Sequence, residues 1–93
     1  MVNPKRTKSY PLDGDTIKIQ TSLNGSDKVR LSGVNAPELG SRAGNVARDK
    51  LARLLKGKPI TIQTVARDVY GRNVGVVRVG GRNINNAMKR LGY

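Results

Sequence analysis

The apolar residues of this chain come in short runs that alternate with polar residues, and turn-forming residues separate the runs. The alternation covers residues 16–20, 29–31, 60–65 and 73–79. Because side chains in a strand point alternately to its two faces, each run predicts a strand with one buried face. A chain of 93 residues has room for one domain with a small core.

Two other segments have the period of an α-helix. We predict one helix over residues 45–56 and a short one over residues 84–91. The apolar stripes are formed by Ala47, Leu51, Leu54 and Leu55 in the first helix and by Ile84, Ala87, Met88 and Leu91 in the second. Gly57 and Pro59, which follow the first helix, are typical of a helix end.

The expected order is three strands, a helix, two strands and a helix. It predicts a mainly β fold with α-helices (α+β), a five-stranded OB-type Greek-key barrel with a helix after strand 3 and a short C-terminal helix. An SH3-like barrel and an α+β roll are alternatives. Gly33 predicts a bend before Val34, Pro37 ends that strand, and residues 24–27 predict a hairpin turn. We expect residues 1–9 to be a basic flexible arm and residues 10–93 to be the domain.

The charge of the chain points to a polyanionic partner. Eighteen Lys and Arg residues face six Asp and Glu residues, for a formal net charge of +12. Such a surface displaces the counterions of a phosphate backbone, although charge alone does not separate a nuclease from a binding protein. The chain has no His and no Cys, which excludes catalysis by histidine, thiolate metal sites and disulfides.

Membrane and export signals are missing from the sequence. No apolar run is long enough to span a bilayer, and no apolar region follows the basic first residues. We therefore expect no intact signal peptide and either a cytoplasmic protein or a trimmed secreted form. The expected partner is DNA and/or RNA, with no membrane, and we expect a monomer.

Carboxylates at the predicted strand ends are the first candidates for chemistry. Asp13 and Asp15 lie in Asp13-Gly14-Asp15-Thr16, which is common turn chemistry when it occurs alone. A carboxylate held at the start of a strand is also a suitable ligand for a hard cation such as Ca²⁺.

The segment from Arg30 to Glu38 combines a cation, an amide, a carbonyl and a carboxylate. Arg30 alone is typical of a solvated strand position, and Asn35-Ala36-Pro37-Glu38 alone is typical of a turn. Ala36 precedes a proline and is therefore held in an extended conformation, which can direct its carbonyl.

The segment Arg67-Asp68-Val69-Tyr70-Gly71-Arg72 is either a charged hairpin tip or part of a binding site. In the second interpretation Arg72 grips a phosphate while the ring of Tyr70 lies beside it. Phosphate contacts and base stacking commonly divide in this way on nucleic acid.

Together these motifs resemble the staphylococcal nuclease-like (thermonuclease) family over residues 10–92. The resemblance rests on Asp13-Gly14-Asp15-Thr16, Val29-Arg30-Leu31, Ala36-Pro37-Glu38, Gly44, Ala47, Tyr70-Gly71-Arg72 and Asn85-x-Ala87-Met88 before Gly92. Each motif is weak alone, but their order and spacing are specific. The resemblance implies an OB-type barrel and a Ca²⁺-dependent endonuclease that hydrolyses DNA and/or RNA with little sequence specificity and leaves 3′-phosphate ends.

The resemblance also implies roles at the reacting phosphate. Arg30 and Arg72 are similar to the two guanidinium groups that hold the scissile phosphate in the family. Glu38 is similar to the carboxylate proposed to activate or position the attacking water. Tyr70 would line the nucleotide site, with Arg67 and Asp68 as further nucleic-acid-binding residues.

For the metal, the resemblance implies that Asp15 and the carbonyl of Ala36 bind Ca²⁺, with Asp13 and Thr16 as supporting residues. Asn35 occupies a position where the best-studied members have a ligand Asp. An amide oxygen can coordinate Ca²⁺, but fewer carboxylates generally mean weaker binding, so another divalent ion is an alternative.

Two other functions are kept as alternatives. OB barrels commonly bind single strands without cutting them, so the first is a non-catalytic OB-fold nucleic-acid-binding module. The second is a protein–protein module that shares the fold, since fold does not dictate function.

Overall fold

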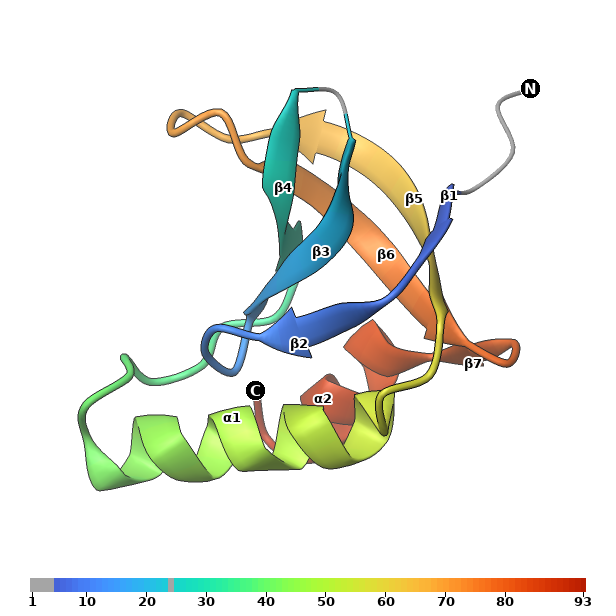
Figure 1. Cartoon of the computed structure of the whole chain (residues 1–93). Helices are drawn as coiled ribbons and strands as arrows, with labels where there is room; N and C mark the ends of the chain where they lie inside the picture. The colour runs from blue at the N-terminus through green and yellow to red at the C-terminus, as the bar shows by residue number, and fades with distance from the viewer. Residues whose placement is uncertain (1–4, 24) are drawn as a thin grey trace.

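One curved sheet with two helices at one end makes up the protein (Figure 1). The computed structural model describes residues 5–23 and 25–93. The strands are β1 (Lys5–Thr7), β2 (Ser9–Pro11), β3 (Thr16–Leu23), β4 (Ser26–Leu31), β5 (Ile60–Arg67), β6 (Asn73–Val79) and β7 (Arg82–Asn83), and the helices are α1 (Arg42–Leu55) and α2 (Ile84–Arg90).

The strands pair as in an OB-type barrel. Their order is β1-β5-β6-β4-β3-β2, with β7 on β6. Strand β4 is parallel to β6, and the other pairs are antiparallel. Only Lys8 separates β1 from β2, which lie at opposite ends of this order, so the two act as one bent strand and curl the sheet. Counted in this way, the predicted five strands and the helix after the third are confirmed.

The N-terminal segment differs from the prediction of an arm over residues 1–9. Residues 5–7 form β1 on β5, and Ser9 begins β2 on β3. This segment has no apolar alternation to reveal a strand. Its backbone partners belong to β3 and β5 and exist only in the folded sheet. Residues 1–4 lie outside the described residues, as does Asn24 of the predicted hairpin turn.

Several predicted boundaries differ from the observed ones by a few residues, and two of the differences have clear local reasons. Helix α1 begins at Arg42 rather than near residue 45, because the Ser41 hydroxyl accepts a hydrogen bond of 2.9 Å from the Gly44 N–H and caps the helix. The first turn of α1 is polar, so the apolar stripe could not reveal it. Strand β4 ends at Leu31 rather than near Pro37, because Gly33 turns the chain at a φ of 74°.

The core lies between the inner face of the sheet and the two helices. Both predicted helix stripes contribute to it, except that Leu91 follows the end of α2 and is 45% exposed. Burial of each large apolar side chain contributes about 1.5–3 kcal/mol. The buried cluster consists of Ile17, Ile19, Val29, Leu31, Val34, Leu51, Leu55, Ile60, Ile62, Val77, Ile84 and Met88.

In the part of the chain that the structure describes, neither helix is long and apolar enough to cross a membrane.

Candidate functional site

The turn between β2 and β3 holds two carboxylates close together. Asp13 Oδ1 accepts hydrogen bonds from the backbone N–H of Asp15 (3.0 Å) and of Thr16 (2.8 Å), which fixes Asp15 at the start of β3. Burial raises the pKa of the Asp13 carboxyl, and the neighbouring Asp15 carboxylate raises this pKa further. A cation between these two groups would relieve their repulsion.

Asp15 is connected to the loop after β4 through Arg30. Asp15 Oδ2 accepts a hydrogen bond from the Ala36 N–H (3.1 Å) and lies 3.6 Å from Arg30 Nη2. The same Nη2 donates to Asn35 Oδ1 at 2.8 Å, and Arg30 Nη1 donates to the Val34 carbonyl at 3.2 Å. The fold thus gathers a carboxylate, a guanidinium and an amide from segments distant in sequence.

The chemistry of this group fits a hard divalent cation. The residues of this group carry oxygen donors in the carboxylates of Asp13 and Asp15, the Asn35 amide and the Ala36 carbonyl, a donor set of the kind Ca²⁺ takes. Among residues 5–23 and 25–93, however, no three His, Cys, Asp or Glu side chains cluster around a point that could hold an ion. The donor set that the described residues form near the turn therefore holds only two carboxylates, and Asn35 Oδ1 already accepts a hydrogen bond from Arg30.

Glu38 lies on the loop between β4 and α1, and the helix start holds its backbone. Its carbonyl accepts a hydrogen bond of 2.9 Å from the Ser41 hydroxyl. A Cβ on Gly44 would lie 1.8 Å from that carbonyl oxygen, so only glycine lets the loop pack here. Glu38 is exposed, and the structure gives its carboxylate no bond to any described residue. The sequence analysis missed Ser41, whose only signal was that Ser is a preferred N-cap residue.

The connection between β5 and β6 is organised around Asp68. Its carboxylate accepts hydrogen bonds from the backbone N–H of Tyr70 (3.0 Å) and of Arg72 (2.9 Å) and from Arg72 Nε (2.6 Å). The Arg72 guanidinium carbon lies 5.3 Å from the centre of the Tyr70 ring, and Arg67 Nη2 donates to the Gly71 carbonyl at 2.8 Å. Asp68 thus orients Arg72, while Arg67 stabilises the turn itself.

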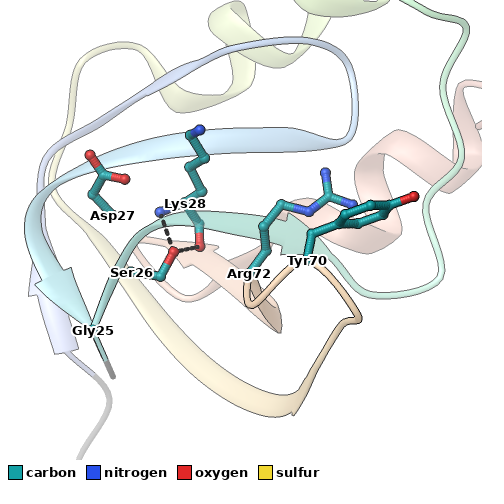
Figure 2. Close-up of a pocket in the computed structure, with 6 residues that line it drawn as sticks. All are labelled: Gly25, Ser26, Asp27, Lys28, Tyr70 and Arg72. Atoms are coloured by element: carbon teal, nitrogen blue, oxygen red, sulfur yellow. Dashed lines mark hydrogen bonds between the residues drawn. The ribbon is translucent and has the colours of Figure 1, made fainter.

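Strand pairing places Arg72 on the same face as Arg30. In the parallel register Val29 pairs with Asn73 and Arg30 with Val74, so Arg72 lies at the level of Lys28 on the outer face. Lys28 and Arg72 project to the same side of the sheet, with the Tyr70 ring beside Arg72 (Figure 2). They border a hollow of about 690 Å³ lined by Gly25, Ser26, Asp27, Lys28, Tyr70 and Arg72. Sequence reasoning missed Lys28, whose signal was its position two residues before Arg30 in the alternation.

The Asp68 interactions predict a pH-dependent stability. Desolvation acts to raise the pKa of Asp68, but hydrogen bonds from Arg72 and from the Tyr70 N–H outweigh it and hold the pKa below the usual 3.8. A lowered folded-state pKa stabilises the fold above the unfolded-state value, and this contribution is lost as the pH falls through the folded-state pKa. Asp68→Asn should lower the Tm at pH 7, and its difference from the wild type should shrink below pH 3.8.

The measurement is thermal unfolding, monitored by circular dichroism, from pH 7 down to values below pH 3.8. Asp49→Asn removes the same charge from an exposed position on α1 and serves as the control. If the difference in Tm between Asp68→Asn and the wild type stays constant down to the lowest pH, the lowered pKa of Asp68 does not stabilise the fold.

Comparison with known proteins identifies the family. A family model described as staphylococcal nuclease homologue matches residues 28–93, more than half of the chain. The chain belongs to the staphylococcal nuclease family. The matched segment contains Arg30, Glu38 and Arg72 and begins after Asp15. The family predicted from the sequence is thereby confirmed.

Several curated relatives of this chain carry nuclease names. An uncharacterized endonuclease of Escherichia coli is 38% identical over 82 residues, which cover 87% of this chain and 53% of the relative. An uncharacterized endonuclease of Haemophilus influenzae is 35% identical over 80 residues, covering 86% of this chain and 45% of the relative. A micrococcal nuclease of Shigella flexneri is 39% identical over 66 residues, covering 71% and 37%. The chain thus spans about half the length of the first two relatives.

Proposed function

We propose that this domain is a metal-dependent endonuclease that hydrolyses phosphodiester bonds of DNA and/or RNA with little sequence specificity. The observation that carries the proposal is the contact of Arg30 with both Asp15 (3.6 Å) and Asn35 (2.8 Å). In this proposal, the cation that would bind the phosphate lies directly beside oxygen atoms that would bind a metal. The nuclease names of the relatives support the same reaction class.

In the proposed reaction each residue has a separate task. Arg30 and Arg72 donate hydrogen bonds to the phosphoryl oxygens, where negative charge builds up in the transition state. The exposed carboxylate of Glu38 orients the attacking water or takes its proton. Asp15, the Ala36 carbonyl and Asn35 would hold Ca²⁺ or another divalent ion, with Asp13 supporting the turn. When bound, the ion supplies further neutralisation of the phosphate charge.

The test is cleavage of denatured DNA and of RNA with Ca²⁺, Mg²⁺, Mn²⁺ or EDTA. We expect cleavage that a divalent ion supports and EDTA abolishes. Asn35→Asp adds a carboxylate to the donor set, so it should lower the Ca²⁺ concentration needed for half-maximal cleavage. The proposal fails if the folded protein binds nucleic acid but cuts none of it with any of the ions.

One observation favours a second function, a nucleic-acid-binding barrel without catalysis. Asn35 replaces a carboxylate in the donor set, and its amide oxygen is bonded to Arg30. This function predicts binding that weakens with salt but is the same in Ca²⁺ and in EDTA. Cleavage that requires a metal would exclude it.

A further inference from the structure

A row of side chains crosses the outer face of the sheet from β2 to the start of β6. Tyr10 on β2 pairs with Lys18 on β3, and Lys18 pairs with Lys28 on β4. Arg72 lies at the level of Lys28, because the following residue, Asn73, pairs with Val29. Neighbouring strands are about 4.8 Å apart, so three gaps give a row of roughly 14 Å perpendicular to the strands.

Two hollows follow this row and meet at Asp27. The first, of about 690 Å³, includes Lys28, Tyr70 and Arg72. The second, of about 440 Å³, is lined by Lys8, Ser9, Tyr10, Lys18, Ile19, Gln20 and Asp27. Asp27 lines both hollows and lies 3.6 Å from Lys18 Nζ. The two hollows are therefore adjacent, one beside Arg72 at the candidate site and the other beside Tyr10 on β2.

An exposed aromatic ring lies near each end of the row, because Tyr10 forms one end and the Tyr70 ring lies beside Arg72 at the other. Tyr10 is 55% exposed and Tyr70 is 79% exposed. The chain has no Trp and no Phe, and the third of its three Tyr, Tyr93, packs against the core cluster. Two of the three rings thus lie on this one surface. Exposed rings that flank cations suit unpaired bases joined by phosphates, because a duplex keeps its bases stacked on one another.

We propose that single-stranded nucleic acid lies along this row, with one base on Tyr10 and with phosphates at Lys18 and Lys28 before the strand reaches Arg72. The proposal rests on the proposed function in one respect, because that function places the reacting phosphate at the Arg72 end of the row. It adds a binding subsite, formed by Tyr10 and Lys18, that is separate from the residues of the reaction. OB barrels occupy about 4–16 nucleotides of a single strand, so the subsite matters for substrates longer than a few nucleotides.

The first test measures binding in EDTA, so that it does not depend on cleavage. Fluorescence anisotropy would compare a single strand of about 12 nucleotides with its duplex. Tyr10→Ala should raise the Kd for the single strand roughly 5- to 150-fold, whereas Tyr10→Phe keeps the ring and should bind like the wild type. Asp27→Asn removes a negative charge beside the row and should lower the Kd for the single strand.

Salt dependence separates a phosphate contact from a general loss of charge. Lys18→Ala should reduce the slope of log Kd against log salt by about 0.7, the value for one phosphate contact on a single strand. Lys58→Ala is the control, because it removes the same charge from an exposed residue between α1 and β5. We expect this control to leave the slope unchanged.

The outcomes distinguish this proposal from the proposed function. If the Tyr10→Ala and Lys18→Ala variants bind the single strand as tightly as the wild type does, the subsite is overturned. A loss of duplex binding equal to the loss of single-strand binding would overturn the single-strand path. Absence of cleavage in a metal assay, with the Tyr10 and Lys18 effects intact, would count against the nuclease and leave the path standing.

Discussion

Replacing Glu38 by glutamine is expected to lower kcat for phosphodiester cleavage about 10²–10⁴-fold, the usual effect of losing a general base. The substitution keeps the size of the side chain and removes its charge. Because the Glu38 carboxylate is exposed and bonded to no described residue, the free energy of unfolding should change by no more than about 0.5 kcal/mol. The measurement is single-turnover cleavage of denatured DNA, together with thermal unfolding of both proteins.

A matched control comes from an exposed carboxylate elsewhere. Asp49→Asn on α1 also removes one negative charge and should cleave like the wild type. Arg30→Ala is a less clean test, because Arg30 also donates to the Val34 carbonyl and to Asn35 and its loss would disturb the loop. Equal cleavage by Glu38→Gln and wild type would remove Glu38 from the mechanism.

Replacing Asn85 by alanine is expected to destabilise the fold by about 2–6 kcal/mol, a large share of the 5–15 kcal/mol typical of a domain. Asn85 is 2% exposed. Its amide donates to the carbonyls of Ser32 (2.9 Å) and Gly75 (3.0 Å), and its Oδ1 accepts from the Val77 N–H (3.0 Å). The Gly75 carbonyl keeps a second bond from the Ser32 N–H, so the variant leaves the Val77 N–H and the Ser32 carbonyl without this partner.

Urea unfolding measures this loss, and the next residue supplies its control. Asn86 lies on the exposed side of α2, so Asn86→Ala should stay within about 0.5 kcal/mol of the wild type. Because Ser32 leads into the loop that carries Asn35 and Ala36, Asn85→Ala should also lower cleavage at temperatures where the protein is still folded. A stability equal to that of Asn86→Ala would show that Asn85 does not join α2 to the sheet.

Local patterns in the sequence were sufficient for the fold class and for most elements. The alternation over residues 73–79 predicts β6 with its observed bounds, and the stripe of Ala47, Leu51 and Leu55 predicts the buried face of α1. These features follow from residues close together in the chain, because side-chain periodicity is a local property. The motifs around Asp15, Arg30, Glu38 and Arg72 likewise name the family and the candidate residues without any coordinates.

Other features depend on partners distant in the sequence, and only the tertiary structure reveals them. Residues 5–7 form a strand because β5 offers a free edge. Arg72 and Lys28 share a surface because β4 and β6 pair in parallel, although 43 residues lie between them. Asn35 Oδ1 accepts a hydrogen bond from Arg30, because the turn at Gly33 brings Asn35 back toward β4. Backbone and side-chain polar groups take whichever partners the folded chain brings near, and a linear pattern does not record that choice.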